Sequence, residues 1–179
     1  NLPISIQKIN IKGLSLDSRQ TKKNYLFFAI KGTQYNGENY IYNAIRKGAK
    51  VVVCDINCKI RNTKITIIKV KNIRKTITDA CTIFYQTKPK NIIAVTGTNG
   101  KSSVADFYHQ ILIAQKIPVA SLGTLGIKIN NKLTRSNLTT LDIISLHREL
   151  AKIKRLGIDN VILEASSHGL EQGRLDGLN

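Results

Sequence analysis

The sequence lacks the features that mark a membrane protein or a secreted, disulfide-bonded one. No apolar run approaches the length of a membrane-spanning helix, and no signal-peptide pattern opens the chain. Cysteine is scarce, and Cys54, Cys58 and Cys81 lack the paired spacing of a metal site. We therefore expect reduced thiols in a cytoplasmic protein that has no membrane partner.

Acidic residues are scarce too: 11 Asp and Glu stand against 28 Lys and Arg, which gives a net charge of +17. Such an excess is typical of nucleic-acid-binding proteins. One alternative to an enzyme is therefore a basic, nucleotide-dependent RNA-binding protein. The lysines are scattered, however, and no RNA-binding aromatic motif accompanies them. We expect no nucleic-acid partner, and a moderately basic surface also suits a highly anionic small-molecule substrate.

One segment carries a clear chemical signal. The apolar run 92–95, rich in β-branched residues, leads into Thr96-Gly97-Thr98-Asn99-Gly100-Lys101-Ser102-Ser103, after which a helical pattern begins. Glycines let several backbone N–H groups point at one anion, and the helix adds its positive N-terminal end. Lys101 offers a cation to the β- and γ-phosphates, and Ser102 offers a hydroxyl to Mg²⁺. The segment predicts a site for ATP and Mg²⁺ formed by Gly97, Thr98, Asn99, Gly100, Lys101, Ser102 and Ser103.

The match to the general phosphate-loop pattern is incomplete. That pattern has a glycine at the position of Val95, and here the glycines are spaced more closely. An ordinary turn between a strand and a helix is the alternative. The order of strand, loop, Lys-Ser and helix favours the phosphate loop.

Periodicity predicts an α/β protein with two domains, 1–87 and 88–179, separated by a break at Thr87-Lys88-Pro89-Lys90. The second domain has the strand-helix-strand rhythm of a mainly parallel sheet. The predicted strands are 26–30, 51–55, 65–70, 92–96, 118–123 and 161–164, and the predicted helices are 40–47, 73–85, 102–115 and 143–156.

Ligands of parallel sheets bind beyond the carboxyl ends of the strands. The phosphate loop follows one predicted strand, and Glu164 ends another. If these strands are neighbours, the Ser102 hydroxyl and the Glu164 carboxylate would meet at one Mg²⁺. We therefore take Ser102 and Glu164 as candidate metal ligands, and Lys101 and Glu164 as candidate catalytic residues. A salt-bridged Glu164 at a strand end is the alternative.

The remaining charged side chains give weaker signals. We expect Asp17 and Arg19 to form a structural pair. His109 and His147 fall in helical patterns and are expected to be solvent-facing or partly buried, not ligands. For His168 two readings stay open, a site residue or a histidine that packs a loop.

Several strings resemble the Mur ligases, which add amino acids to the peptidoglycan precursor. The phosphate loop resembles their ATP loop, and Ser15-Leu16-Asp17-Ser18-Arg19 with the segment that follows it resembles their N-terminal domain. The most specific string, Glu164-Ala-Ser-Ser-His-Gly-Leu-Glu-Gln-Gly-Arg174, resembles the MurE branch, which adds the third residue of the stem peptide. The resemblance runs from about Leu14 to Asn179.

The resemblance implies a small UDP-binding α/β domain followed by the first part of a parallel-sheet ATPase domain. It implies an ATP-dependent ligase that joins a diamino acid, by our choice diaminopimelate, to UDP-MurNAc-L-Ala-D-Glu through an acyl phosphate. L-lysine addition, another Mur ligase and folylpolyglutamate synthase are the alternatives. The family's remaining motifs would lie beyond Asn179, so we expect an N-terminal fragment that is inactive alone. We also expect the protein to be a monomer.

The resemblance also implies which residues hold the UDP-linked substrate. In the first domain Ser18, with Leu16 behind it, contacts the uracil and the diphosphate, and the segment Thr33-Gln34-Tyr35 is the loop that closes on the nucleotide. In the second domain the residues hold the peptide and sugar end. Leu141 departs from the family pattern, in which proline is common, and Leu138 stands where some members have asparagine. The implied substrate-binding residues are Leu16, Ser18, Thr33, Gln34, Tyr35, Thr139, Thr140, Ser166, Gln172 and Arg174.

Overall fold

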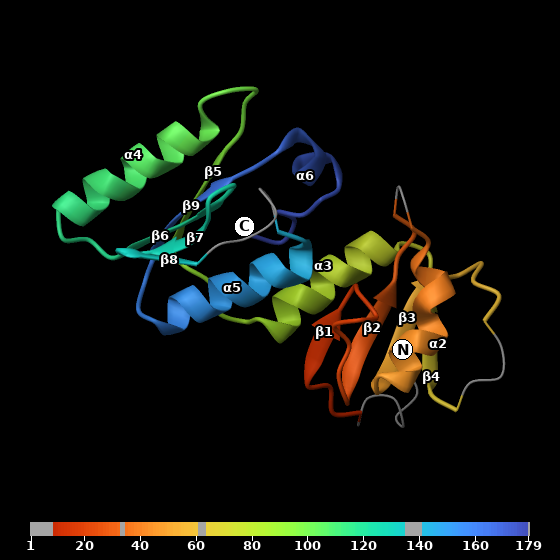
Figure 1. Ribbon diagram of the computed structural model, residues 1–179. Helices are drawn as coiled ribbons and strands as arrows, with labels where there is room; N and C mark the ends of the chain where they lie inside the picture. The colour runs from red at the N-terminus through yellow and green to blue at the C-terminus, as the bar shows by residue number, and fades with distance from the viewer. Residues whose placement is uncertain (1–8, 33–34, 61–63, 135–140, 179) are drawn as a thin grey trace. The chain divides into compact units, whose positions relative to one another are not determined.

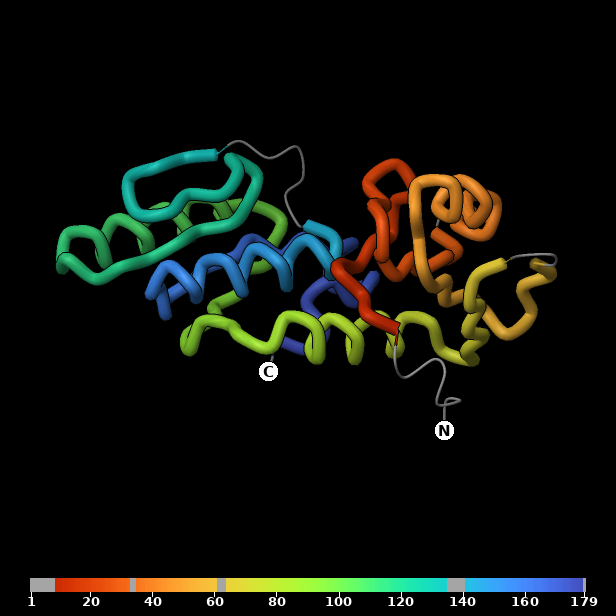
Figure 2. The backbone as a smooth tube through the Cα atoms, turned by 90° about the horizontal axis from the view of Figure 1, so that it is seen from below, coloured from red at the N-terminus to blue at the C-terminus, as the bar shows by residue number. Residues whose placement is uncertain are grey.

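The computed structural model describes residues 9–32, 35–60, 64–134 and 141–178. The chain forms two compact units, residues 1–80 (unit 1) and 81–179 (unit 2). The division falls inside α3 (Ile73–Phe84), which is one continuous helix along the chain (Figure 2). The domain boundary predicted at 87/88 lies a little further along and remains a prediction.

Unit 1 is built on a sheet of four parallel strands in the order β1-β2-β3-β4. Parallel neighbours need a crossover connection, and between β2 and β3 the chain supplies a short helical one. The strands are β1 (Gly13–Ser15), β2 (Tyr25–Ala29), β3 (Ala49–Asp55) and β4 (Thr66–Val70), and the crossover contains the 3₁₀ helix η1 (Gly37–Tyr40) and α2 (Ile41–Arg46).

The core of unit 1 lies between this sheet and α2 (Figure 1). Phe27 and Val52, on neighbouring strands, are fully buried and pack in one cluster with Ile41 and Ala44 of α2. Strands buried on both faces are expected to be continuously apolar, and β3 is buried at every position from Val51 to Cys54. Removal of this apolar surface from water is the main stabilising term for the unit.

Unit 2 contains a sheet in the order β5-β9-β6-β7-β8. The first three strands are parallel, and β7 and β8 continue the sheet as antiparallel strands. The strands are β5 (Asn91–Val95), β6 (Val119–Gly123), β7 (Gly126–Ile129), β8 (Lys132–Thr134) and β9 (Asn160–Glu164). The helices that belong wholly to this unit are α4 (Lys101–Ala114), α5 (Ile143–Arg155) and α6 (Ser167–Glu171).

Helices α4 and α5 cover opposite faces of this sheet (Figure 1). Leu122 and Leu163 belong to the cluster that packs against Leu150 of α5. Successive side chains of a strand alternate between faces, so Glu164 points to the face that carries α4. The strand pattern therefore decides on which side of the sheet the carboxylate lies.

The predicted fold class is confirmed. Each predicted strand and helix is present, and its observed ends differ from the predicted ends by no more than two residues. The turn at Asn130-Asn131 connects β7 to β8. Pattern analysis missed the short elements β1, β7, β8 and α6. In the described ranges, every helix is too short or too polar to cross a bilayer.

Candidate functional site

The parallel strands of unit 2 end together at one edge of the sheet. Val95 of β5 lies opposite Glu164 of β9, and Leu163 lies opposite Leu122 of β6. The loop after β5, the end of β9 and the turn after β6 therefore meet at the carboxyl edge, where ligands of such sheets bind.

The loop after β5 has the backbone of an anion-binding turn. Gly97 and Gly100 have φ of 150° and 80°, values that only glycine adopts readily. Gly100 is the N-cap of α4 and has no side chain with which to cap the helix, so first-turn N–H groups of α4 remain for a ligand. The Lys101 ammonium folds over this loop and donates to the carbonyl oxygens of Gly97 at 2.6 Å and Thr98 at 3.4 Å.

The Glu164 carboxylate is the polar centre of the edge. The residue is only 4 % exposed, and burial of a carboxylate requires compensating hydrogen bonds. Its Oε2 accepts from the Ser102 hydroxyl and the Thr124 hydroxyl, each at 2.9 Å, and its Oε1 accepts from the Thr124 N–H at 3.2 Å. Two predicted site residues, Ser102 and Glu164, are thus in contact.

This arrangement suits a small, hard cation shared with phosphate oxygens. Mg²⁺ binds oxygen at about 2.0–2.1 Å in an octahedron, so adjacent ligands are about 2.9 Å apart. The oxygens of Ser102 and Glu164 have that separation, 2.9 Å. No cluster of three or more His, Cys, Asp or Glu side chains able to hold a metal occurs among the described residues. A site with one carboxylate fits an ion that completes its shell with water and nucleotide.

Sequence reasoning missed Thr124. A signal was present, because Thr124 is the polar residue directly after the predicted strand 118–123. The strand order was the missing information: β6 lies beside β9, and this adjacency places Thr124 next to Glu164.

The segment after β9 forms α6 and a tight turn. Ser166 is the N-cap of α6, and its hydroxyl accepts from the Gly169 N–H at 3.1 Å. Arg174 donates to the Gln172 side-chain oxygen from Nε at 3.0 Å and from Nη2 at 2.7 Å. The structure therefore brings Gln172 and Arg174 together, and it gives Ser166 a structural role besides the predicted substrate contact.

The predicted uracil and diphosphate contacts of unit 1 follow the ends of neighbouring strands. Leu16 and Ser18 come just after β1, and Tyr35 lies in the connection after β2. Tyr35 is 69 % exposed, whereas Ser18 is 4 % exposed. Ser18 is therefore held within its turn, and Tyr35 is open to a ligand.

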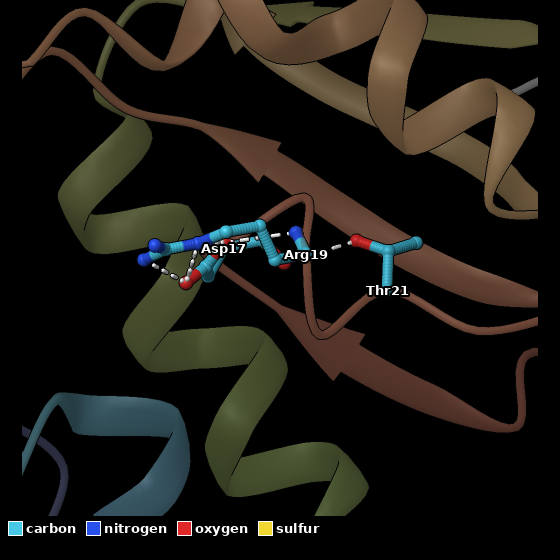
Figure 3. Close-up of polar contacts among 3 residues, drawn as sticks. All are labelled: Asp17, Arg19 and Thr21. Carbon is cyan, nitrogen blue, oxygen red and sulfur yellow. Dashed lines mark hydrogen bonds and ion pairs between the residues drawn. The ribbon is translucent and has the colours of Figure 1, made fainter.

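The turn around Ser18 is fixed by its own polar residues (Figure 3). Arg19 donates hydrogen bonds to the Asp17 carboxylate from Nε at 3.0 Å and from Nη2 at 2.8 Å, which confirms the predicted structural pair. The Arg19 guanidinium holds the pKa of Asp17 below its usual range. The Thr21 hydroxyl donates to the Asp17 carbonyl at 3.2 Å and bonds with the Ser15 hydroxyl at 2.9 Å.

The prediction for the helical histidines was wrong as to burial. His109 and His147 are 1 % and 5 % exposed, and burial lowers the pKa of both imidazoles. Nε2 of His147 lies 3.0 Å from the Asp176 carbonyl. The His168 side chain is instead 84 % exposed and pairs with Glu171 at 3.7 Å, so it packs no loop.

Cys54, Cys58 and Cys81 are buried, and none of them forms a disulfide bond. Burial raises the pKa of the Cys54 and Cys81 thiols to about 12, so both are protonated at neutral pH. The remaining candidates, Thr33, Gln34, Thr139 and Thr140, lie outside the described residues.

Two family models match the chain. The model of the Mur ligase family, catalytic domain, matches residues 10–85, and the model of the Mur ligase middle domain matches residues 95–179. Together they account for both units.

Similar proteins carry the names of one enzyme. The UDP-N-acetylmuramoyl-L-alanyl-D-glutamate–2,6-diaminopimelate ligase of Rickettsia bellii is 44 % identical over 96 % of this chain and 36 % of its own length. The enzyme of that name from Brucella melitensis is 36 % identical over 96 % of this chain and 35 % of its own length. The chain thus spans about a third of the curated relatives that it matches.

Solved structures agree with this likeness. One described as a UDP-N-acetylmuramoyl-L-alanyl-D-glutamate–2,6-diaminopimelate ligase matches with a TM-score of 0.77 and 33 % identity, over 93 % of this chain and 34 % of that one. A MurF ligase from Thermotoga maritima, described as in complex with ADP, shares the fold with a TM-score of 0.57 and 19 % identity, over 94 % of this chain and 35 % of that one. Because the Mur ligase family models match both units and relatives named as such ligases match nearly the whole chain, the chain belongs to the Mur ligase family.

Proposed function

We propose that the protein containing this chain is an ATP-dependent ligase that joins meso-diaminopimelate to UDP-MurNAc-L-Ala-D-Glu. The single observation that carries the proposal is the contact between Ser102 and Glu164, 2.9 Å apart, beside an open phosphate loop. The identity of 44 % to a diaminopimelate-adding relative supports the choice of diamino acid over L-lysine.

In this proposal the loop from Gly97 to Gly100 binds the ATP phosphates through its backbone N–H groups. The positive end of α4 adds to their attraction, since that helix begins at Lys101. The Lys101 ammonium, now bonded to loop carbonyls, turns to the β- and γ-phosphates. Catalysis by these groups is positioning and neutralisation of phosphoryl charge.

Ser102 and Glu164 would hold Mg²⁺ through a hydroxyl oxygen and a carboxylate oxygen. When bound, the ion would neutralise the charge on the phosphate oxygens of ATP. The bond from the Ser102 hydroxyl to Glu164 Oε2 directs the serine proton away from its lone pairs, which are then available as ligands.

The remaining candidates bind the UDP-linked substrate. Leu16 and Ser18 contact the uracil and diphosphate, Tyr35 belongs to the loop that closes on the nucleotide, and Gln172 and Arg174 hold the peptide end. A guanidinium suits this task because it binds a carboxylate or phosphate through two parallel bonds. The fork that Arg174 places on Gln172 would be offered to the substrate instead.

The reaction transfers the γ-phosphoryl group of ATP to the D-glutamyl carboxylate, which gives ADP and an acyl phosphate. The amine of the diamino acid attacks the acyl carbon and forms the new C–N bond, phosphate leaves with the C–O bond electrons, and the nitrogen loses a proton to solvent. The chain covers about a third of its relatives, so we assign turnover to the longer protein and none to this piece alone. The enzyme would act as a cytoplasmic monomer on small molecules.

The test is phosphate release by the full-length protein with ATP, Mg²⁺, UDP-MurNAc-L-Ala-D-Glu and one added amino acid. Turnover with diaminopimelate and little with L-lysine is the expected result. Turnover with L-lysine alone would correct the choice of amino acid. Turnover with neither, or with a folate monoglutamate, would overturn the assignment.

A further inference from the structure

We propose that Thr124 is a positioning residue that holds the Glu164 carboxylate in place to receive the divalent cation of the nucleotide. The inference rests on the proposed function, because it takes Glu164 as a ligand of that cation. Its place directly after the predicted strand 118–123 does not by itself reveal this role, which follows from contacts between β6 and β9.

Two bonds from Thr124 reach both oxygens of the carboxylate. The hydroxyl donates to Oε2 at 2.9 Å, and the backbone N–H donates to Oε1 at 3.2 Å. Donors on both oxygens fix the rotation of the carboxylate plane as well as its position. The carboxylate is therefore already held at the edge of the sheet before the cation arrives.

Gly123 supplies the space that this arrangement needs. A Cβ at position 123 would lie 2.1 Å from Oε1 and 2.5 Å from Cδ of Glu164. Such distances are far below van der Waals contact, so any side chain at position 123 would displace the carboxylate. The requirement for glycine is a close approach and not a left-handed backbone.

The place of Thr124 in the fold separates this role from one in the core. Thr124 and Leu125 form the turn between β6 and β7, in which Gly123 pairs with Gly126. Thr124 is exposed at this turn. Loss of its hydroxyl therefore leaves the packing of the sheet intact and changes the support of Glu164.

The experiment measures ATP binding to the full-length protein by titration calorimetry, once with Mg²⁺ and once with EDTA. Thr124→Val removes the hydroxyl at nearly constant shape. Because loss of a group that supports a metal ligand costs about 10- to 100-fold in metal affinity, we expect about a tenfold loss of affinity with Mg²⁺ and no change with EDTA. Thr124→Ser should restore the affinity, and Gly123→Ala should weaken it further.

Thr134→Val, at an exposed position of β8, is the matched control and should behave as the wild type. Wild-type protein that binds no ATP, or binds it equally well without Mg²⁺, would refute the proposed function itself. Wild-type protein that depends on Mg²⁺ beside an unchanged Thr124→Val variant would refute only the role of Thr124. An equal loss with and without Mg²⁺, or no rescue by serine, would also refute it.

Discussion

The two units place polar groups at the carboxyl edge of a parallel sheet in different ways. In unit 1 the polar turn is local: Arg19 binds Asp17 two positions away, and Ser15 bonds Thr21 six positions away. In unit 2 the Glu164 carboxylate receives bonds from Ser102 and Thr124, which are 62 and 40 positions away. The first arrangement needs only a turn, whereas the second exists only when three strands have taken their order.

This difference has a physical consequence for the two sites. A local turn forms early and at small cost in loop entropy, so it can persist while the rest of the unit is loosened. A site assembled from distant segments depends on the sheet that holds them. Substitutions in the core of unit 2 should therefore disturb its site more than substitutions in the core of unit 1 disturb the Asp17 turn.

The largest effect is expected from the cores. Phe27→Ala should destabilise unit 1 by about 3–5 kcal/mol, and Leu150→Ala should destabilise unit 2 by about 2–5 kcal/mol, because each empties a fully buried position. Hydrogen exchange read separately in β3 and β9 checks both. Phe27→Ala should leave the amides of β9 protected from exchange. Equal loss of protection in β3 and β9 would contradict the distinction between the units, because it would show that they unfold as one.

Lys101→Ala should weaken ATP binding by about 100-fold or more, because it deletes the cation that the proposed function assigns to the phosphates. Titration calorimetry on the full-length protein measures the loss, and Lys132→Ala, at an exposed position of β8, is the control. Binding of the UDP-linked substrate by unit 1 should persist. Unaltered ATP affinity in the Lys101 variant would contradict the phosphate-loop assignment.

Arg174→Lys should raise KM for the UDP-linked substrate about tenfold and leave KM for ATP nearly unchanged, since one charge-assisted bond of the fork is lost. Arg148→Lys, on the exposed side of α5, serves as the matched control. Steady-state kinetics with each substrate varied in turn separates the two constants. A rise confined to ATP would move Arg174 from the substrate to the nucleotide.

The smallest effect concerns mild acid, between pH 7.5 and pH 5.5, and it should appear in unit 2, because the buried His109 and His147 both lie there. Burial lowers the folded-state pKa of His147 below 6.5, so the unfolded chain binds a proton first as the pH falls. The free energy of unfolding is therefore highest above pH 6.5 and decreases below it. The decrease is at most about 1.4 kcal/mol per pH unit for each buried histidine.

Denaturant midpoints at pH 7.5 and 5.5 measure this loss in unit 2. His147→Gln keeps a donor for the Asp176 carbonyl and removes the titration, so the difference between the two midpoints should shrink. A wild-type difference retained by the His147 variant would assign the acid response elsewhere.

Local sequence patterns predicted the elements and the ends of the functional strands. The run from Val95 to Lys101 identified a strand, a loop and a helix start because glycine spacing and helix capping act over a few residues. The pair of Asp17 and Arg19 was also predictable, because the two residues are only two positions apart in the chain. The burial of His109 was not, since a helical pattern places a residue on a face and does not say what covers that face.

What the sequence alone determined is therefore the α/β class, the glycine-containing loop between a strand and a helix that we propose binds phosphates, and the identity of Glu164 as a carboxylate at a strand end. The tertiary structure decided that β9 lies between β5 and β6, because strand order depends on which apolar faces pack and not on any local signal. That order brings the Ser102 hydroxyl within 2.9 Å of Glu164 and places Thr124 on its other side. Hydrogen bonds act over a few ångströms, so contacts between residues far apart in the chain exist only once the sheet is formed.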